Sequence, residues 1–141
     1  MICLQNDVTG QVRPSADAQV LGKLRSSSAG LCLGDDTDDS VALVTCHEHL
    51  YERHLLVELT ARGALVRAGR CLEPADSTVA WAACAADSPR QRWWMSDDGR
   101  LSPVTAPRQC LAAVTAERRL AVLRDCADNA DATQRWNFVN F

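Results

Sequence analysis

The sequence predicts an all-β fold, built from three copies of a unit of about 40 residues that share one core. The first observation is a repeated Cys-Leu pair: the pairs begin at Cys32, Cys71 and Cys110, and both intervals are 39 residues. A fixed period of about 20 to 50 residues is the signature of repeated supersecondary units. The second observation is the apolar spacing, which from Leu21 onward is mostly two, in short runs bounded by Gly, Asp, Ser and Pro. This spacing is typical of many short strands and does not support long helices.

Each copy contains four candidate strands in the same order, so three copies predict twelve strands. A Gly-x-Leu opening is followed by the Cys-Leu pair, by a strand that ends in a second cysteine, and by a Gln-x-Trp segment. The openings start at Gly22, Gly63 and Gly99; the second cysteines are Cys46, Cys84 and Cys126; and the last segments are Gln91-Arg92-Trp93 and Gln134-Arg135-Trp136. In the first copy this last place reads Glu52-Arg53-His54 or Arg53-His54-Leu55.

A single copy cannot bury its own apolar face, so the three copies are expected to close on one core. Leu43, Trp81 and Leu123 each stand three residues before the second cysteine and are expected to point inward. Trp93 and Trp136 should fill the same core. The Gln side chain before each of them can bond backbone groups of a neighbouring loop with both ends of its amide. We therefore expect the main role of Gln91 and Gln134 to be structural.

Two stretches could be read as helical from their Ala and Leu content, residues 61–68 and 114–123. Gly63 interrupts the first of them and Gly69 directly follows it, and the repeat places both stretches in strands and loops. We follow the repeat rather than the propensity.

Length and charge limit the possible functions. A chain of 141 residues is one ordinary domain. Its net charge of −3 gives no basic footprint for nucleic acid, and no apolar run is long enough to span a bilayer. The first 25 residues lack the apolar segment of a signal peptide. Residues 1–20 do not match the repeat and are predicted to be a linker or the tail of a preceding domain, with the repeat domain at 21–141.

Six of the seven cysteines pair by repeat, which predicts disulfides Cys32–Cys46, Cys71–Cys84 and Cys110–Cys126 and leaves Cys3. Each loop closure could contribute roughly 3 kcal/mol. Disulfides persist in oxidising compartments, yet the chain carries no signal, so we expect a module cut from a longer chain or a short isoform of one. The alternative is six reduced, buried thiols that act as small hydrophobes.

Three aligned sets of Cys-Leu, strand-Cys and Gln-x-Trp resemble the ricin-B-type β-trefoil lectin over about residues 21–141. The opening LGKLRSSSAGLCL and the CHEH at residues 46–49 are most similar to the C-terminal lectin module of polypeptide N-acetylgalactosaminyltransferases. The resemblance implies a β-trefoil that binds glycans or glycopeptides of galactose or N-acetylgalactosamine type. It also implies a catalytic domain attached in a longer chain, a place in the Golgi lumen or outside the cell, and no catalytic site or cofactor in these residues.

The resemblance further implies a shallow sugar pocket in each repeat, made by three side chains. An acid directly after Cys-Leu accepts bonds from sugar hydroxyls, an aromatic two residues before the second cysteine stacks on the sugar, and an Asn stands beside the Gln. The second copy has Glu73 and Gln91, but Ala82 replaces the aromatic and Arg90 replaces the Asn. Trp81 is one residue off, which on a strand means the opposite face.

The other two copies are further from this pattern. The first has Gly34 at the acid position, Asp35 one place later, Val44 at the stacking position, and His47 directly after its second cysteine. The third has Ala112 and Arg124 at the first two positions and is not expected to bind sugar. If any pocket binds sugar we expect the second, with the first as a poorer candidate.

The residue patterns give little support for a metal site or for catalysis. Cys46, His47, His49 and His54 lack the paired spacing of a zinc site, and the Asp run at 35–39 lacks the Gly and Glu of a calcium loop. We expect no metal. Two hypotheses remain open: a carbohydrate-binding module, and a β-trefoil without sugar binding that serves as a structural or protein-interaction module.

Overall fold

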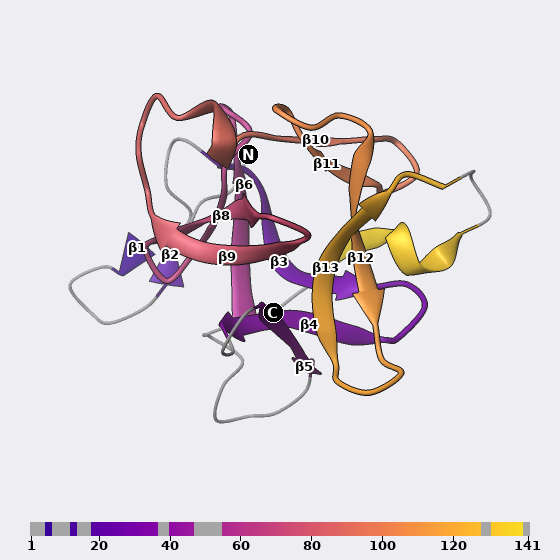
Figure 1. Ribbon diagram of the computed structural model, residues 1–141. Coiled ribbons are helices and arrows are strands. Elements are labelled where there is room, and N and C mark those ends of the chain that lie inside the picture. Colours follow the sequence, from indigo (N-terminus) through magenta and orange to yellow (C-terminus); the bar gives the residue numbers. More distant parts are fainter. Residues whose placement is uncertain are drawn as a thin grey trace.

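The computed structural model describes residues 5–6, 12–13, 18–36, 40–46, 55–127 and 131–139, with side chains from Val20 onward. Within these residues the protein consists of strands and short 3-10 helices, without an α-helix (Figure 1). The elements are β1 (Gln5–Asn6), β2 (Val12–Arg13), β3 (Ala18–Ser26), β4 (Leu31–Asp36), β5 (Val41–Thr45), β6 (Leu56–Thr60), β7 (Leu65–Arg67), β8 (Arg70–Ala75), β9 (Thr78–Ala83), η2 (Pro89–Gln91), β10 (Trp93–Met95), β11 (Leu101–Pro103), β12 (Gln109–Val114), β13 (Leu120–Asp125), η3 (Ala132–Gln134) and β14 (Trp136–Val139).

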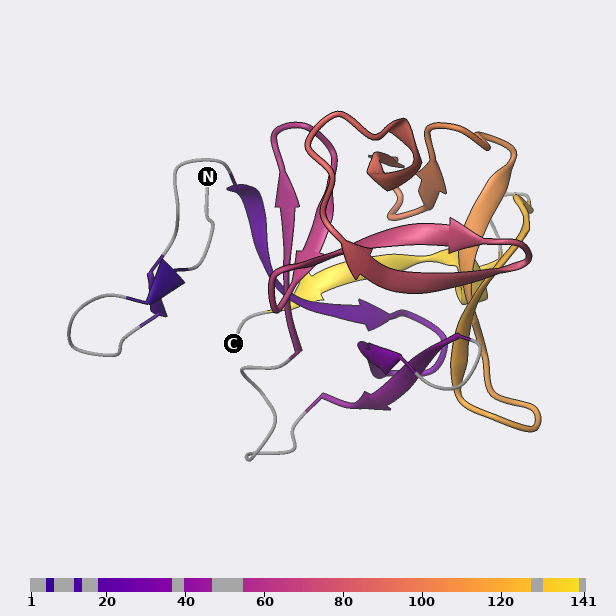
Figure 2. The same cartoon turned by 60° about the vertical axis from the view of Figure 1, so that its left-hand side comes forward.

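The strands β3 to β14 are the twelve that the repeat predicts, four in each copy. Residues 61–68 form a turn and β7, and residues 114–123 lie in β12, a turn and β13, so preferring the repeat over helix propensity was right. The strand β3 begins at Ala18, three residues before the expected boundary at Leu21, because its first residues pair with Thr60 and Leu59 of β6. The ribbon of β1 and β2 lies to one side of the body formed by β3 to β14 (Figure 2).

The first and last strands of each copy form a closed ring of six strands. Four junctions are antiparallel pairs: β14 with β3, β3 with β6, β6 with β7, and β10 with β11. Two matching hydrogen bonds make the other junctions, because the backbone N–H groups of Trp93 and Trp136 donate to the carbonyls of Gly63 and Gly99, both at 2.8 Å. Each junction of the ring therefore joins two strands of the same copy or of adjacent copies.

The glycine of each Gly-x-Leu opening is required by this closure. A Cβ built on Gly22 would lie 2.5 Å from the carbonyl oxygen of Val139, and one on Gly63 would lie 3.0 Å from that of Trp93. A Cβ on Gly99 would clash with the Trp136 carbonyl in the same way. Gly63 and Gly99 also have φ of 88° and 90°, which L side chains rarely adopt. The repeated glycine therefore marks where two backbones meet.

The two middle strands of each copy form a hairpin, and the three hairpins meet at one end of the ring. The strand β13 pairs with both β5 and β9. The backbone N–H groups of Leu43 and Leu123 donate to the carbonyls of Arg119 and Ser77 on the neighbouring hairpin, both at 2.9 Å. At the third equivalent place Trp81 N–H donates instead to the Asp36 carboxylate, at 3.0 Å. The hairpins therefore keep threefold symmetry except where a side chain replaces a backbone acceptor.

The core lies inside the ring and under the hairpins, with equivalent residues from every copy. Leu43, Trp81 and Leu123 are all buried in it, as predicted, and Trp93 and Trp136 are 4% and 1% exposed. The leucines of the Gly-x-Leu and Cys-Leu pairs are fully buried: Leu24, Leu65, Leu101, Leu33, Leu72 and Leu111. Trp81 points inward and its indole N–H donates to the Gly34 carbonyl at 2.7 Å, so it is a core residue and not a sugar platform.

The three predicted disulfides are all present. Cys32–Cys46, Cys71–Cys84 and Cys110–Cys126 join the two strands of each hairpin, with Cα atoms 5.2, 5.0 and 4.9 Å apart. Cys3 lies outside the described residues. No helix among the described residues is long and apolar enough to cross a membrane.

Candidate functional site

The second repeat brings together three of the residues that the sequence singles out: Glu73, Arg90 and Gln91. Glu73 lies on β8, and the Cys71–Cys84 disulfide ties this strand to β9. The chain then returns through η2, whose first residue is Pro89 and whose last residue is Gln91. Proline suits the first position of a helical turn because its fixed φ is helical and it lacks an N–H. The loop after the disulfide is thereby folded back over β8.

Gln91 is the residue that holds this loop in place. Its side chain is buried, with 5% exposure. The carbonyl end of the amide accepts from Ala85 N–H at 2.8 Å, and the amino end donates to the Ala83 carbonyl at 2.9 Å. The amino end also donates to Glu73 Oε1 at 2.9 Å. Gln91 therefore uses both ends of its amide on the loop, as expected, and in addition orients the Glu73 carboxylate.

The Glu73 carboxylate is engaged on both oxygens. Its Oε2 lies 3.2 Å from Arg90 Nη2, in an ion pair with side-chain exposures of 19% for Glu73 and 59% for Arg90. The same Arg90 nitrogen donates to the Pro74 carbonyl at 2.6 Å. Ala80 and Ala82 are the β9 residues opposite Glu73 and Cys71. The acid is thus held by an amide and a guanidinium, with alanines on the strand opposite.

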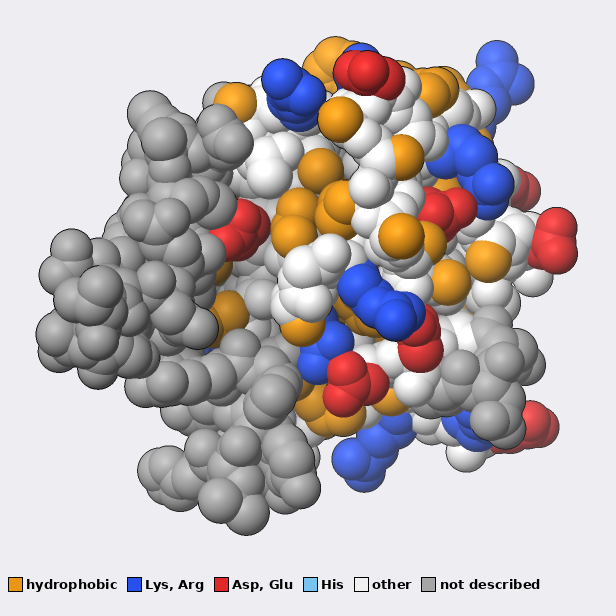
Figure 3. All heavy atoms as spheres, turned by 90° about the vertical axis from the view of Figure 1, so that its left-hand side faces the viewer, with side chains coloured by type: hydrophobic (Ala, Val, Ile, Leu, Met, Phe, Trp, Pro, Cys, Tyr) orange, Lys and Arg blue, Asp and Glu red, His pale blue; other side chains and the backbone are white. Residues whose placement is uncertain are grey.

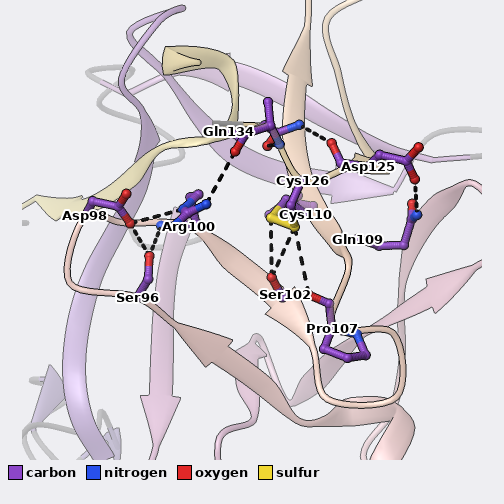
Figure 4. The surroundings of a disulfide bond; sticks show 12 residues. Ser96, Asp98, Arg100, Ser102, Pro107, Gln109, Cys110, Asp125, Cys126 and Gln134 are labelled. Atoms are coloured by element: carbon purple, nitrogen blue, oxygen red, sulfur yellow. Dashed lines mark hydrogen bonds and ion pairs between the residues drawn. A yellow bond between two sulfur atoms is a disulfide. The ribbon is translucent and has the colours of Figure 1, made fainter. Parts of the chain in front are cut away.

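The third repeat keeps the same glutamine without the acid. Gln134 is 3% exposed, accepts from Ala127 N–H at 2.8 Å, and donates to the Asp125 carbonyl at 2.8 Å. The position equivalent to Glu73 is Ala112, which is fully buried. Figure 4 shows Gln134 and Asp125 beside the Cys110–Cys126 disulfide. This repeat therefore retains the loop scaffold and lacks a carboxylate at the position equivalent to Glu73.

In the first repeat Asp35 is committed to a different partner. Its carboxylate lies 2.6 Å from Arg67 Nη2, while its side chain is 78% exposed. The register of β4 against β5 shifts between Leu33 and Asp36, so Asp35 does not take the place that Glu73 has on β8. His47, the other candidate of this repeat, lies outside the described residues.

Arg67 is a buried cation that sequence reasoning missed. Its side chain is 6% exposed, and its guanidinium lies 5.8 Å from the ring centroid of Trp81. Cation–aromatic contacts of this length are attractive, more so when water is excluded. The equivalent positions in the other copies, Ser26 and Pro103, are also buried. The sequence does contain a signal for this ion pair: Arg67 is a charged residue at a position that the repeat assigns to the interior.

Two aspartates outside these sites have perturbed acidity. A hydrogen bond from the Ser96 hydroxyl, with help from Arg100, lowers the pKa of Asp98 below its ordinary value. Hydrogen bonds from the side chain and backbone of Thr133 lower the pKa of Asp131, which is the N-cap residue of η3. Asp98 is exposed, and Asp131 is partly buried. Among the described residues no three His, Cys, Asp or Glu side chains are grouped to hold a metal ion.

The surface carries charges of both signs. On the face shown in Figure 3, Lys and Arg side chains are interspersed with Asp and Glu, and no broad region of one sign forms.

Comparisons with known proteins place this geometry in a family. No curated protein sequence matches the chain. Among solved structures, GalNAc-T7 with UDP, GalNAc and Mn²⁺ is similar with a TM-score of 0.70 and 19% identity, over 87% of this chain and 23% of that one. The bitter gourd (Momordica charantia) homologue of type II RIPs, in complex with α-methyl-D-galactoside, gives a TM-score of 0.68 and 14% identity over 91% and 50%. Hemolytic lectin CEL-III gives 0.69 and 20% over 96% and 34%.

At these identities the structures establish a common fold, and this chain spans less than a quarter of the GalNAc-T7 chain. The family itself is established by sequence. The model of the ricin-type β-trefoil lectin domain matches residues 20–136, which is well over half of the chain and includes all three disulfides. The chain therefore belongs to the ricin-type β-trefoil lectin family, whose domain is a carbohydrate-binding and not a catalytic one.

Proposed function

We propose that this chain is a glycan-binding module of galactose or N-acetylgalactosamine type, and that its site lies in the second repeat. Glu73 is the acceptor for two sugar hydroxyls. The observation that carries the proposal is the 2.9 Å hydrogen bond from Gln91 to Glu73 Oε1, which fixes a carboxylate on a rigid hairpin. An ionised carboxylate offers about four lone-pair sites. Gln91 and Arg90 use two of them, which leaves acceptor capacity for the sugar.

The module binds weakly under this proposal. Ala82 offers no aromatic face, and stacking of that kind is worth about 1 kcal/mol. With a few polar contacts alone, the dissociation constant for a monosaccharide falls at about 1 mM or weaker. Clustered glycans would raise the avidity, because a second contact made within one assembly has a high effective concentration.

We further propose that the module works as part of a longer secretory protein, such as a polypeptide N-acetylgalactosaminyltransferase, in the Golgi lumen or outside the cell. Two observations support this. The three disulfides require an oxidising compartment. The GalNAc-T7 structure also contains a region of the same fold within a much longer chain.

Sugar titration followed by backbone amide shifts tests the proposed site. Galactose and N-acetylgalactosamine are added to tens of millimolar to the oxidised wild type and to Glu73→Ala. Shifts should cluster around Glu73, Ala82 and Gln91 in the wild type and disappear in the variant. The control is Glu117→Ala, which removes an exposed carboxylate from the β12–β13 turn. Shifts that cluster at 112–127 and survive Glu73→Ala would refute the site, and no shifts at all would refute sugar binding.

A second candidate function, a structural or protein-interaction module without sugar binding, is favoured by one observation. Arg90 lies against Glu73 Oε2 and the Pro74 carbonyl, where the resemblance expects an Asn. Replacing Arg90 by Asn separates the two candidates. If Arg90→Asn acquires sugar-dependent shifts that the wild type lacks, the native arginine closes the site and the second candidate holds.

A further inference from the structure

An exposed tryptophan lies outside the three sugar positions of the repeats. Trp94 is 65% exposed, whereas the other three tryptophans are 4% exposed or less. It follows Trp93 on β10, and the alternation of a strand turns it outward when Trp93 points into the core. Its indole N–H makes no hydrogen bond with a described residue. A large aromatic face is thus presented to solvent.

Trp94 lines a hollow of about 430 Å³ between β10, the β6–β7 turn and Val104. A second hollow, of about 390 Å³, adjoins it on the side of the Cys71–Cys84 disulfide. Both hollows share Thr60, Ala61, Arg62 and Arg92. Each has the size of a small-molecule site. The two neighbouring hollows, with the two arginines among the residues that they share, are called the groove below.

The walls of the groove are held rigidly by backbone hydrogen bonds. Trp93 N–H donates to the Gly63 carbonyl at 2.8 Å, which fixes β10 to the β6–β7 turn. Val104 N–H donates to the Arg92 carbonyl at 2.9 Å, which fixes the end of β11 to the same segment. Thr60 Oγ1 accepts from Ala64 N–H at 3.0 Å and closes the turn itself. The groove therefore exists before any ligand arrives, which lowers the entropic cost of binding.

The charged residues among the described lining of the groove are two arginines, Arg62 and Arg92. Arg62 and Arg92 are exposed, and their guanidinium groups make no ion pair or hydrogen bond with a described residue. None of the described residues that line either hollow is acidic. By contrast Arg67, Arg90 and Arg100 each face a carboxylate. Glu73 lies beyond Gln91 and is itself paired with Arg90. The two groove arginines are thus available to an anion.

We infer that this groove binds a saccharide that carries a carboxylate, at a site separate from the Glu73 position. A sugar has an apolar face that packs on an indole ring, and Trp94 supplies that face. A sugar carboxylate is planar and matches the fork of a guanidinium, and Arg62 and Arg92 supply two such forks. Toward the disulfide there is room for a second sugar ring, between small apolar residues (Ala61, Ala64, Ala85 and Ala86) and polar ones (Thr60, Ser88 and Gln91).

The test is a titration with methyl glucuronide and with N-acetylneuraminic acid, followed by tryptophan fluorescence and amide shifts. Because three tryptophans are buried, quenching by acrylamide reports mainly on Trp94. Either acid should protect Trp94 from quenching and shift amides at 60–64 and 92–95. Trp94→Ala should weaken binding about tenfold or more, and Trp94→Tyr, which keeps an aromatic ring, should retain most of it. Arg62→Gln with Arg92→Gln should weaken binding by a similar factor, whereas Arg108→Gln, a single exposed arginine outside the groove, should not.

Several outcomes would overturn the inference. Equal binding of neutral methyl galactoside in the groove would remove the role of charge. Binding of inorganic phosphate that is as strong, and unaffected by Trp94→Ala, would show a site for anions alone. Binding of a hexaglutamate peptide without either sugar acid would indicate a protein partner. Glu73→Ala should leave the titration with sugar acids unchanged, so failure here and failure of the proposed galactose site are distinguishable.

Discussion

The second and third repeats share the scaffold of their Gln-x-Trp loops and differ in whether the glutamine meets a carboxylate. In both, a buried glutamine bonds the backbone on either side of the second cysteine, and the following tryptophan donates to the carbonyl of the Cys-Leu leucine at 2.9 Å. Only Gln91 has a carboxylate partner, because Ala112 stands where Glu73 would be. The Gln-x-Trp motif is therefore part of the scaffold, and its presence does not by itself indicate a sugar site.

The largest effect should come from the tryptophans, and it should be equal in both repeats. Trp93→Ala and Trp136→Ala each empty a large aromatic site in the core and should lower the free energy of unfolding by about 3 to 5 kcal/mol. Urea or thermal unfolding measures this. A loss under about 1 kcal/mol in both variants would mean that the Gln-x-Trp segments do not build the core.

Removing a disulfide should cost about 3 kcal/mol in either repeat, since the closed loops have similar lengths. The disulfides differ, however, in how accessible their sulfur atoms are to a reductant. Cys84 is exposed and Cys126 is partly buried, whereas Cys32 and Cys46 are both buried. Under a limiting amount of reductant, Cys71–Cys84 should open first and Cys32–Cys46 last, as peptide mapping of alkylated samples would reveal. Reduction in the reverse order would contradict the prediction that solvent exposure of the cysteines sets the order.

Substitution of the two glutamines should separate effects on stability from effects on sugar binding. Gln91→Ala and Gln134→Ala each leave buried backbone groups without partners and should lower the free energy of unfolding by about 1 to 3 kcal/mol. Only Gln91→Ala should also abolish galactose-dependent amide shifts, because it releases Glu73. If Gln134→Ala abolished them equally, the third repeat would have to contain the site.

Glu73→Gln should change stability by less than about 1 kcal/mol, because the ion pair with Arg90 is partly solvated and the amide keeps the shape of the side chain. The same change should remove galactose binding. Paired urea unfolding and sugar titrations test this combination. A stability loss comparable with that of Gln91→Ala would make Glu73 a structural residue.

The smallest expected effect concerns the N-caps of the two 3-10 helices, η2 in the second repeat and η3 in the third. Asp131 caps η3 through Thr133, whereas Ser88 makes no side-chain cap on η2. Because the pKa of Asp131 is lowered on folding, its contribution is present above the unfolded pKa and is lost as pH falls through the folded pKa. An amide titration of Thr133 should therefore have its midpoint below that of an ordinary Asp, and the amides of η2 should not follow it. Asp131→Asn serves as the control and should remove the transition.

The sequence predicts the fold well because its signals are local and repeated three times. The Cys-Leu period gave the twelve strands and the disulfides, and the position of Trp81 relative to its cysteine gave its inward direction. The ion pair of Arg67 with Asp35 could not be predicted as a pair, because it joins two repeats across the fold. The groove beside Trp94 depends in the same way on β6, β7, β10 and β11 meeting in space. The expected linker at residues 1–20 and the roles of Glu73, Arg90 and Asp35 in sugar binding stay predictions.

The ring closed through Gly63 and Gly99 has a consequence for how this domain meets other molecules. Sheets with an open edge can take up an extended peptide as an additional strand, and the same edge is a template for aggregation. In this ring, each described strand has a backbone neighbour on both sides. A partner that meets the ring is therefore expected to contact its side chains and loops rather than add a strand to it, and substitution of Gly63 or Gly99 is expected to open the junction that this glycine closes.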